Sequence, residues 1–521
     1  MEFDYIIIGA GSAGCVLANR LSAQAEVSVL LLEAGGPDRH PFIRIPAAFS
    51  KLYKSKLDYG FYTEPQAHAA NRRLFSPRGK TLGGSGSINA MIYIRGHRSD
   101  FDAWAAAGNQ GWSYNDVLPY FLKAENNANF NDAYHSQAGP WHISLPKAAH
   151  PLTHAYLEAG AAAGLPILAD MNGAQDEGVG LHQLNQHNGA RHSPAHAYLL
   201  PARGRSNLSI KTGVRVDKLM LEKQKVVGIE VALHGKTQQI RAKREVILSA
   251  GAYHSPLLLQ RSGIGEGNCL QRLGIAVQHD LPGVGHNLHD HPVAPLIYRV
   301  PKSSSLDGAD TPWNLLRWLF TRQGPFTSNV AEGGGFLRTV PELDAPDIQL
   351  HFAPAFFVDH GFTQPPGNGM SLAPIVLRPK SRGSVKPHPS QPHLPVIDPQ
   401  LFSNPDDLIT LREGFKRAYE IMEAAPLKGW RQMPFMPHHR LSSDHEIENY
   451  LRETAELLYH PVGTCRMGND NQAVVDAHLK VHGLSGLRVV DASIMPQVVS
   501  GNTQAATIMI AEKGADLILG R

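Results

Sequence analysis

A strand, a glycine-rich turn, a helix and a second strand follow one another at the start of this chain. Residues 5–8 read Tyr-Ile-Ile-Ile, a β-branched run that predicts a strand buried on both faces. The turn at residues 9–14 reads Gly-Ala-Gly-Ser-Ala-Gly, and an amphipathic helix follows it. The second predicted strand, at residues 27–32, ends on Glu33. This order of elements is the one in which a G-x-G-x-x-G sequence binds a dinucleotide.

Each residue type of the turn has a physical role in that binding. Gly9 permits the tight turn, Gly11 lets the backbone approach a pyrophosphate, and Gly14 lets helix and strand pack closely. The helix N-terminus then offers free N–H groups and the positive end of its dipole to the phosphates. Glu33 is placed to accept hydrogen bonds from ribose hydroxyls, although the turn alone does not separate NAD from FAD. The contacts predicted from this segment are Gly9, Gly11, Ser12, Ala13, Gly14, Glu33 and Ala34.

The bulk composition limits the classes of protein to consider. A length of 521 residues exceeds one ordinary core, so we expect two domains or one large elaborated unit. The formal net charge of +3 comes without long basic blocks, so we expect no nucleic-acid partner. Three cysteines far apart in the sequence favour a reducing compartment over a disulfide framework. With no bilayer-length apolar stretch and no basic leader, we expect a cytoplasmic protein, with peripheral contact to the inner membrane left open.

A second glycine-rich segment, Gly-Lys-Thr-Leu-Gly-Gly-Ser-Gly-Ser-Ile-Asn, lies at residues 79–89. Small residues let the backbone approach a flat or phosphorylated ligand closely. A surface linker is the alternative interpretation, but linkers rarely run straight into an apolar segment such as residues 90–94. We therefore expect this segment to approach the same ligand.

The two glycine segments and four later motifs together resemble the glucose–methanol–choline (GMC) family of flavin oxidoreductases. The resemblance spans nearly the whole chain and implies FAD as the cofactor. Within the family, the chain looks most like the alcohol dehydrogenases of alkane-degrading bacteria and the choline dehydrogenases. The motifs lie at residues 9–14, 79–89, 251–265, 283–291, 459–468 and 489–493.

Several positions bear on how the implied FAD is held. Some family members attach FAD to a histidine in the second glycine segment, but Ile88 stands there, so we expect non-covalent FAD. Gly86 stands where Ser or Thr is common in the family, which loosens the loop, and Gln260-Arg261 occupies a usually apolar stretch. The resemblance places Asp491 near the ribityl chain or the pyrophosphate, and the backbone of Val214 near the adenine. Its further FAD contacts are Arg78, Thr81, Gly83, Gly84, Ser85, Asn89, Ala90, Met91, Ile92, Ala250, Gly251, Ala492, Asn502 and Thr503.

His460 and Asn502 are the catalytic residues that the resemblance implies. Alcohol oxidation needs the hydroxyl proton removed while hydride leaves carbon for the flavin N5, and a neutral imidazole suits that proton transfer. An amide beside it can donate to the developing alkoxide. Asn502 precedes a helical run at residues 505–519, so helix N–H groups would face the electron-rich end of the flavin. The alternative is an ordinary structural histidine, and only the motif singles out His460 among 27 histidines.

We expect an α/β fold, α+β overall, in which a Rossmann-type FAD-binding domain is joined to a substrate domain. The FAD-binding domain is discontinuous, and the substrate domain is built on an antiparallel sheet and helices. The predicted ranges are 1–150, 190–292 and 458–521 for the first domain and 151–189 and 293–457 for the second. Strands at residues 208–211, 226–231 and 245–248 belong to the first domain.

The expected reaction is oxidation of a primary alcohol to an aldehyde. Residues 353–358 are apolar and fall in the predicted substrate domain, which favours a neutral aliphatic or aromatic alcohol. A carboxylate facing the pocket would instead favour choline or another polar alcohol. The motifs do not separate a dehydrogenase that uses a quinone or dye-like acceptor from an oxidase that uses oxygen. A flavin photoenzyme of the same fold group is the alternative outside redox catalysis, and His460 with Asn502 argues against it.

Other conspicuous residues are better explained by structure than by chemistry. His286, His289 and His291 lack zinc spacing and partner cysteines, so we expect a cofactor-domain role and no metal. Cys465 has no activating basic context and is predicted to pack in the interior. The aromatic run at residues 313–320 is predicted to pack in the core or to form a lid, with a membrane or electron-acceptor contact as the alternative.

Overall fold

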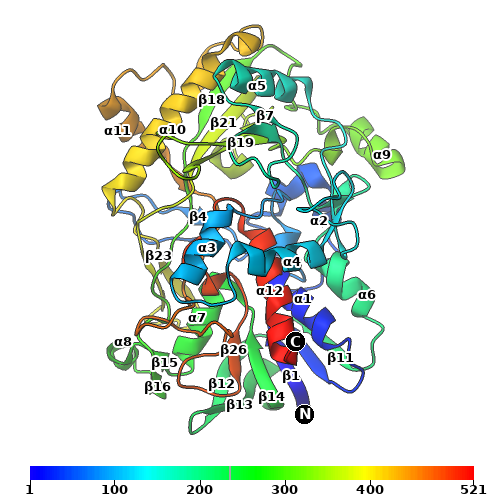
Figure 1. Cartoon of the computed structure of the whole chain (residues 1–521), viewed down its shortest axis with the longest axis vertical. Coiled ribbons are helices and arrows are strands. Elements are labelled where there is room, and N and C mark those ends of the chain that lie inside the picture. Colours follow the sequence, from blue (N-terminus) through cyan, green and yellow to red (C-terminus); the bar gives the residue numbers. More distant parts are fainter. Residues whose placement is uncertain (234–235) are drawn as a thin grey trace.

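The computed structural model describes residues 1–233 and 236–521, which build two large sheets toward opposite ends of the long axis (Figure 1). The sheet that contains the N-terminal strand has, within the described residues, the order β11-β2-β1-β14-β13-β12, with β26 paired to β14. Strands β11, β2, β1, β14 and β26 run parallel, whereas β12 and β13 form an antiparallel meander with β14. The bounds are Glu2–Ile8 for β1, Val29–Glu33 for β2, Leu208–Thr212 for β11, Val216–Glu222 for β12, Lys225–Leu233 for β13, Lys236–Leu248 for β14 and Leu487–Val489 for β26.

Strand β1 lies inside this sheet and confirms the strand predicted at residues 5–8. Its residues Ile6, Ile7 and Ile8 are buried, as expected of a parallel strand covered on both faces. The strand starts earlier than predicted, at Glu2, because Glu2 and the next residue pair with β14. Backbone pairing therefore extends β1 through residues whose polarity does not indicate a strand.

Helix α1 (Ser12–Leu21) and helix α12 (Thr503–Leu519) pack against each other beside this sheet (Figure 1). Nearly every residue of α12 up to Ala515 is buried, which matches its apolar sequence. Arg20 of α1 donates two hydrogen bonds, of 2.8 and 2.7 Å, to the carboxylate of Glu512 in α12. Tyr198 donates a third, of 2.9 Å, so the buried charge of Glu512 is well compensated.

Helix α7 (Gly251–Arg261) follows β14 and contains the two residues that depart from the family pattern. Gln260 is buried, and its amide donates to the carbonyls of Val284 and Val385 at 3.1 and 3.0 Å. Arg261 pairs with Asp217 of β12 at 3.4 Å. Both polar side chains therefore have partners in an otherwise apolar interface.

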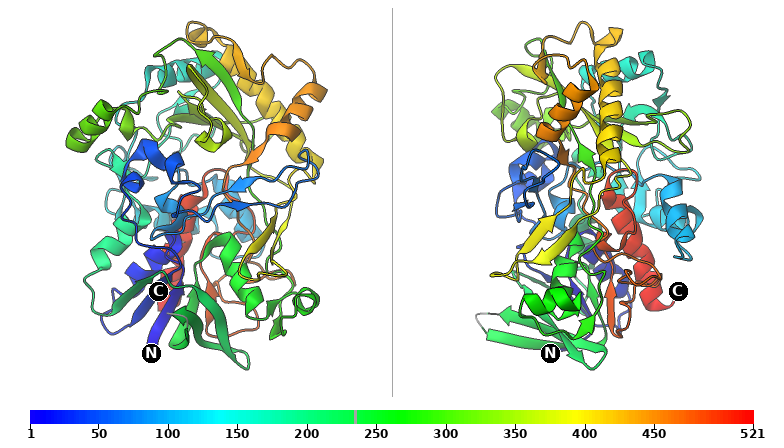
Figure 2. Two further views of the ribbon diagram at one scale, coloured as in Figure 1. Left: turned by 180° about the vertical axis from the view of Figure 1, so that it is seen from behind. Right: turned by 90° about the vertical axis from the view of Figure 1, so that its left-hand side faces the viewer.

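The second sheet has the order β24-β18-β21-β20-β19-β8-β7 within the described residues, with β17 and β25 paired beside β21. Its neighbours are antiparallel except β7 and β8. Helices α5 (Pro151–Ala162), α10 (Pro405–Glu423) and α11 (Asp444–Thr454) lie at this end of the molecule (Figure 2). The bounds are Ile167–Leu168 for β7, Gly178–Leu181 for β8, Pro292–Val293 for β17, Leu296–Val300 for β18, Gly333–Leu337 for β19, Ile348–Ala353 for β20, Asn368–Val376 for β21, Pro434–Met436 for β24 and Glu456–Leu457 for β25.

Local sequence explains why α10 begins where it does. The side chain of Asn404 accepts a hydrogen bond from the backbone N–H of Asp406, and Pro405 occupies the first helical position. Acidic residues in the first turn favour the positive end of the helix dipole. The apolar face of α10 packs on the sheet through residues such as Phe415. The two sheets thus confirm the expected α/β fold with a Rossmann-type sheet and a second, largely antiparallel one.

The remaining elements, apart from helix α9 (Pro312–Thr321), are shorter and lie between or beside the strands of the two sheets. Their helices are α2 (Pro41–Arg44), α3 (Arg98–Ala106), α4 (Tyr114–Ala124), α6 (Leu200–Ala202), α8 (Gly267–Arg272), η1 (Pro46–Leu52), η2 (Gly84–Ser87), η3 (Ala195–Leu199), η4 (Pro325–Thr327), η5 (Asp359–Gly361), η6 (Ala425–Leu427) and η7 (Ala492–Ile494). Their strands are β3 (Phe61–Tyr62), β4 (Phe75–Ser76), β5 (Glu125–Asn127), β6 (Trp141–Ile143), β9 (Gln186–His187), β10 (Ala190–Arg191), β15 (Ile264–Gly265), β16 (His279–Asp280), β22 (Ser384–Pro387) and β23 (Pro395–Asp398).

The structure corrects the prediction that residues 313–320 pack in the core or form a lid. They form helix α9 (Pro312–Thr321), which projects from the side of the molecule (Figure 1 and Figure 2). Trp318 is buried, but Trp313 and Phe320 are 74% and 85% exposed. The prediction was wrong because large apolar residues lie on several sides of this helix, and the sequence does not show which of them pack against the rest of the protein. Within the described residues, no helix combines the length and hydropathy needed to cross a membrane.

The three cysteines are unpaired in the structure. Cys15 and Cys465 are fully buried, and burial raises the pKa of both thiols well above the usual range. Cys269 in α8 is half-buried. The packing role predicted for Cys465 agrees with this placement.

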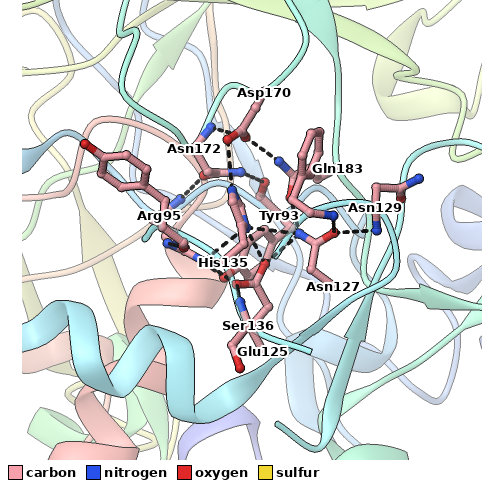
Figure 3. A network of polar contacts seen from close by, with 12 residues as sticks. Tyr93, Arg95, Glu125, Asn127, Asn129, His135, Ser136, Asp170, Asn172 and Gln183 are labelled. Atoms are coloured by element: carbon pink, nitrogen blue, oxygen red, sulfur yellow. Dashed lines mark hydrogen bonds and ion pairs between the residues drawn. The ribbon is translucent and has the colours of Figure 1, made fainter. Parts of the chain in front are cut away.

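A buried polar network lies behind residues 91–95, which connect the second glycine segment to α3 (Figure 3). Arg95 forms an ion pair with Glu125, and the ring of His135 lies 2.9 Å from Glu125 on one side and 2.9 Å from Asp170 on the other. Both ring nitrogens face carboxylate oxygens, which accept hydrogen bonds, so these contacts favour the doubly protonated, positively charged form of His135. Burial would lower the pKa of His135, but the hydrogen bonds to Asp170 and Glu125 outweigh it and raise the pKa to about 9.

The network holds the backbone of residues 93–95 on both sides. The N–H of Tyr93 donates to the carbonyl of Gln183 at 2.8 Å, and the amide of Gln183 donates to Asp170 at 2.6 Å. Asn172 donates to the carbonyl of Tyr93 at 3.1 Å and accepts from the N–H of Arg95 at 3.0 Å. The segment that leaves the second glycine loop is therefore tied to three separate parts of the chain.

The charge on His135 predicts a specific pH dependence of stability. Its pKa rises from 6.5 to about 9 on folding, so its contribution is complete below pH 6.5 and is lost as the pH rises through 9. We expect the difference in free energy of unfolding between the wild type and His135→Gln to shrink between these two pH values in urea titrations. The exposed control His438→Gln should show no such difference, and a difference independent of pH would contradict the ionic role of His135.

Candidate active site

A cavity of about 1210 Å³ lies between the two sheets, larger than the roughly 300–1,000 Å³ of common small-molecule sites. It extends from the first glycine turn to His460 and is lined by residues of both sheets. The predicted site residues on its wall are Gly9, Gly11, Ser12, Ala13, Glu33, Ala34, Arg78, Gly84, Ser85, Asn89, Ala90, Met91, Ile92, Val214, Ala250, Gly251, His460, Asp491, Ala492, Asn502 and Thr503.

The first glycine turn forms one end of the cavity. Gly9 has a φ of +97°, and a Cβ there would lie 2.5 Å from the carbonyl oxygen of Ser249. A Cβ on Gly14 would lie 1.9 Å from the carbonyl oxygen of Gly9, which accounts for its role in helix packing. By contrast, a Cβ on Gly11 would meet protein atoms only at 4.0 Å. Gly11 therefore leaves open the space in which a ligand can come close to the protein backbone.

The second glycine segment packs directly against the first. A Cβ on Gly84 would lie 2.7 Å from the Cα of Gly11, and the N–H of Gly83 donates to the carbonyl of Ala10 at 2.8 Å. Three residues predicted to bind the cofactor, Gly14, Thr81 and Gly83, lie outside the cavity wall. Thr81 instead donates to the carbonyl of Gly36 at 3.1 Å. These three shape the two loops that meet at the cavity.

Glu33 stands at the end of β2 with its carboxylate held by backbone donors. The N–H groups of Ala10 and Gly35 donate to its two oxygens at 3.0 and 2.8 Å. Burial raises the pKa of Glu33 to about 7, although these hydrogen bonds oppose the shift. The carbonyl of Glu33 accepts from the N–H of Val214 at 2.9 Å, which brings Val214 to the same part of the wall. A carboxylate oriented in this way can accept further hydrogen bonds from hydroxyl groups in the cavity.

Three helices direct their N-termini at the cavity. The first residues of α1, α7 and α12 (Ser12, Gly251 and Thr503) all line it. Asp491 binds the start of α7 by accepting from the N–H of Gly251 at 2.9 Å and the hydroxyl of Ser255 at 2.5 Å. Helix dipoles favour negative charge at these three positions, and at α7 the carboxylate of Asp491 already lies there.

Asn89 joins the second glycine segment to α12 and to Arg191. Its amide nitrogen donates to Gln504 of α12 at 2.5 Å. Arg191 is fully buried and donates to the side-chain and main-chain oxygens of Asn89, both at 2.6 Å. The next residues turn sharply, since Met91 has a φ of +63°. Asn89 therefore fixes the direction in which Ala90, Met91 and Ile92 pass along the cavity wall.

His460 and Asn502, the predicted catalytic pair, meet at the other end of the cavity. The Nε2 atom of His460 lies 3.2 Å from the Nδ2 atom of Asn502. The Nδ1 atom of His460 lies 3.1 Å from the Nδ1 atom of His291. The side chain of Gln349 donates to Asn502 Oδ1 at 3.2 Å, which turns Asn502 Nδ2 toward His460. We therefore assign Nε2 of His460 as the acceptor, and its proton to Nδ1 on the side of His291.

A second polar side chain from β20 reaches the same place. Gln349 and His351 are alternate residues of this strand and so project from one face. His351 lines the cavity, next to Asn502. His460, Asn502 and His351 thus place three polar groups around one end of the cavity.

The backbone before His460 is held in an uncommon conformation. Tyr459 has a φ of +67°, in the left-handed region that bulky residues rarely adopt. Arg78 donates to the carbonyl of Tyr459, and the hydroxyl of Tyr459 contacts Nδ1 of His360. Asp290 accepts from the N–H of His460 at 2.8 Å. These contacts offset the strain and orient the imidazole of His460.

Burial keeps the histidines of this site neutral. It lowers the pKa of His460 well below its usual range, and the nearby His291, His351 and Arg78 lower it further. Burial also lowers the pKa of His291 to about 4. At neutral pH, His460 is therefore an unprotonated imidazole and can accept a proton.

Four residues that touch or orient His460 and Asn502 could not be predicted as site residues from the sequence. His291 and Asp290 lie in the motif at residues 283–291, for which the sequence indicated no catalytic role. The other histidines there have separate partners: His289 accepts from the N–H of Val498 at 2.9 Å, and Nε2 of His286 lies 3.4 Å from Glu266. Gln349 and His351 lie in a stretch without a family motif. Their polar side chains at alternate positions of an otherwise apolar strand are the one signal that could have indicated them.

Asp290 provides a test of how this site is held. Its Oδ1 accepts from the N–H groups of His291 and His460 at 2.7 and 2.8 Å, and burial raises its pKa from 3.8 to about 7. The folded state thus binds this proton more tightly, so the charge destabilises the fold increasingly from pH 3.8 to pH 7 and fully above it. We expect Asp290→Asn to unfold at higher urea concentration than the wild type above pH 7, and at the same concentration near pH 4. The control Asp290→Ala removes the acceptor and should destabilise at both pH values, and a less stable Asp290→Asn above pH 7 would contradict the assignment.

Two known enzymes are similar in sequence to this chain over nearly its full length. An alcohol dehydrogenase [acceptor] from Pseudomonas putida is 44% identical over 527 residues, which are 99% of this chain and 96% of the relative. An oxygen-dependent choline dehydrogenase from Ectopseudomonas mendocina is 44% identical over 533 residues, 100% of this chain and 94% of the relative. This chain is therefore similar to enzymes named for two different alcohols and acceptors.

A solved structure and two family models agree with these relatives. The crystal structure of pyridoxine 4-oxidase from Mesorbium loti superposes with a TM-score of 0.92 at 36% identity, covering 100% of this chain and 99% of the other. The N-terminal model of the GMC oxidoreductase family matches residues 3–293, and its C-terminal model matches residues 379–511. Both glycine segments lie in the first match, and His460 and Asn502 lie in the second. The chain belongs to the GMC oxidoreductase family.

Proposed function

We propose that this protein is an FAD-dependent alcohol dehydrogenase that oxidises a primary alcohol to an aldehyde, with His460 as the base. One observation carries the proposal: a buried, neutral His460 lies 3.2 Å from the Asn502 amide, in the cavity that begins at the first glycine turn. The names of the alcohol and choline dehydrogenase relatives support an alcohol as the substrate class.

The residues present fit non-covalent FAD. Gly11 leaves open space where a pyrophosphate would lie, and the N-terminus of α1 offers it a positive dipole end. Glu33 would accept from ribose hydroxyls, as its orientation by Ala10 and Gly35 allows. Ile88 lines the cavity and has no atom that could attach a flavin, which supports the non-covalent mode. FAD in this cavity would supply the two-electron acceptor for the hydride that leaves the alcohol carbon.

The chain's own residues provide the proton transfer and the orientation. A substrate hydroxyl placed between His460 Nε2 and Asn502 Nδ2 would give its proton to the imidazole. Asn502 would donate to the oxygen as negative charge develops, because Gln349 holds the amide in that orientation. The carbon–oxygen bond becomes a carbonyl as the proton and the hydride leave. The N-terminus of α12, which Asn502 immediately precedes, would favour negative charge at this end of the cavity.

The wall nearest His460 supports a neutral alcohol as the substrate. Phe49, Tyr53, Val330 and Phe357 line the cavity and belong to one apolar cluster with Tyr459. Phenylalanine and valine side chains bury an aliphatic or aromatic group favourably but give no hydrogen bond to a polar one, and the hydroxyl of Tyr53 is the one polar group of these four side chains. The apolar residues predicted at 353–358 contribute Ala353, Phe357 and Val358 to this wall.

A cationic alcohol such as choline is the second candidate because Glu456 also lines the cavity. Its Oε1 accepts from Arg72 at 2.9 Å, so its charge is already paired. Burial raises the pKa of Glu456 to about 7, which further reduces its negative charge at neutral pH. A paired, partly protonated carboxylate attracts a cation weakly, so the neutral alcohol remains the preferred proposal.

The electron acceptor stays open between oxygen and a quinone or dye-like molecule. The names of the relatives include oxygen in one case, oxygen-dependent choline dehydrogenase, and an acceptor of no stated kind in the other, alcohol dehydrogenase [acceptor]. A flavin photoenzyme is the alternative function outside redox catalysis. A neutral base hydrogen-bonded to an amide, as in His460 and Asn502, supports proton abstraction from an alcohol over that alternative.

The His460→Ala variant tests the base and the cofactor together. Wild-type protein should be yellow, and anaerobic addition of alcohol should bleach it. The variant should keep the flavin and bleach about 10²- to 10⁴-fold more slowly, the range lost with a general base. The exposed control His438→Ala should bleach like the wild type. Unchanged bleaching in His460→Ala would refute the base, and a colourless protein that FAD cannot reconstitute would refute the cofactor.

A panel of alcohols, assayed with a redox dye under nitrogen and with oxygen, tests the substrate class. We expect kcat/KM for neutral primary aliphatic or aromatic alcohols to exceed that for choline by about tenfold or more, as expected for an apolar wall. The ratio of the two rates for one alcohol assigns the acceptor. A preference for choline that Glu456→Gln abolishes would establish the second candidate in place of the first.

A further inference from the structure

Helix α9 carries an apolar face that points away from the protein. Trp313, Leu316 and Phe320 are spaced by three and four residues and therefore share one side of the helix. They are 74%, 46% and 85% exposed, and Leu319 beside them is 49% exposed. Single exposed apolar residues are common, but four large ones on one ten-residue helix form a patch.

The opposite face holds α9 firmly in place. Trp318 is buried against Ile45 and Ala48, and its indole N–H donates to the carbonyl of Gly189 at 2.8 Å. At the start of the helix, the side chain of Thr311 accepts from the N–H of Asn314 at 3.2 Å. At its end, the guanidinium of Arg322 lies 3.9 Å from the ring of Trp318. The contacts of Trp318 thus hold the helix in an orientation that exposes the face formed by Trp313, Leu316 and Phe320.

Positive charge lies at the edge of this face. Arg317 is exposed, one helical turn from Trp313. It lines a surface hollow of about 500 Å³ together with the exposed Lys147. The acid in this hollow, Glu332, is 1% exposed and accepts from Ser328, Thr153 and the N–H of His150, so it does not neutralise the two cations at the surface.

The acid nearest the start of α9 is also paired. Asp310 lies 3.3 Å from Nζ of Lys51, so it adds no free negative charge to the face. The α9 face therefore combines exposed Trp, Leu and Phe side chains with Arg317, and Lys147 lies in the adjoining hollow, with its Nζ 3.4 Å from the carbonyl oxygen of Arg322 at the end of the helix. Helices that lie in a lipid–water interface have this composition, with aromatic rings at headgroup depth and basic residues toward anionic lipids.

We propose that α9 is a docking helix that binds the surface of an anionic lipid bilayer. Its apolar face would insert at the level of the lipid headgroups, and Arg317 and Lys147 would bind headgroup phosphates. A second protein fits this face less well, because a ten-residue helix is about 15 Å long and about 10 Å wide. Such an area falls well below the roughly 800 Å² that each partner buries in a stable protein–protein interface.

The position of α9 agrees with a lipid surface beside the catalytic cavity. Trp318 packs on residues 45–48, and the next residue, Phe49, lines the cavity near His460. Helix α9 therefore packs on η1 through Trp318 and Ala48, and Phe49 of the same η1 forms part of the cavity wall. Docking through α9 would bring this wall close to the bilayer without covering residues that contact the catalytic pair.

Vesicle sedimentation of the holoprotein tests the proposal directly. We expect binding to vesicles of phosphatidylcholine that contain phosphatidylglycerol, and weaker binding to phosphatidylcholine alone. The double variant Trp313→Glu, Phe320→Glu should bind at least about tenfold less, because it replaces the two most exposed apolar side chains of the face with charges. The matched control Ile167→Glu, Leu200→Glu changes exposed apolar residues elsewhere and should bind like the wild type. Equal melting temperatures of the variants would exclude unfolding as the cause.

The charged part of the face has its own variant. Lys147→Gln with Arg317→Gln should remove the preference for anionic vesicles, and added salt should weaken that preference in the wild type. Failure of the wild type to sediment with either kind of vesicle would overturn the proposal, as would undiminished binding by the α9 variant. If light scattering instead shows a wild-type dimer that the α9 variant dissociates, the face binds a second copy of this chain and the lipid proposal is wrong.

Discussion

The packing of α1 against α12 brings together the two ends of the site. Both helices direct their first residues at the cavity, so their relative position decides how the first glycine turn lies with respect to Asn502. Arg20 and Tyr198 fix that position by holding the fully buried carboxylate of Glu512. A buried charge with several donors resists sliding, because any shift leaves it without partners. The separation of His460 and Asn502 follows from this, since Asn502 immediately precedes α12 and a displacement of about 1 Å can cost a large factor in rate.

Much of the first sheet could be predicted from the sequence because its elements are determined locally. The β-branched run of β1, the glycine turn and the apolar α12 each follow from neighbouring residues. The start of β1 at Glu2 could not be predicted in this way, since it depends on pairing with β14. The position of α9 was predicted wrongly for a related reason. Its apolar sequence indicates a helix that needs partners, but only the tertiary structure shows that Trp318 has them and Phe320 does not.

The site could be predicted as far as single motifs describe it. Most residues predicted at the two glycine segments, together with His460 and Asn502, line one cavity. The contacts that orient them join positions far apart in the chain, as between His291 and His460, and such pairs leave no local pattern. Gln349 illustrates the limit. It contributes no group to the proposed chemistry, yet its hydrogen bond decides which atom of Asn502 faces the base. The roles assigned to the individual site residues remain predictions for the variants described above.

The order of these elements along the chain has a consequence for how the protein is made. The first glycine turn and α1 are synthesised at the outset, whereas β26 and the buried part of α12 consist of residues 487–515 and are synthesised near the end. Until those last residues emerge, β14 pairs with β1 and β13 but lacks its pairing with β26, and α1 lacks its packing against α12. A nascent chain therefore leaves the apolar surfaces of β14 and α1 that β26 and α12 later cover exposed for nearly the whole of translation. Apolar surface that is exposed in this way makes incompletely folded chains prone to aggregation.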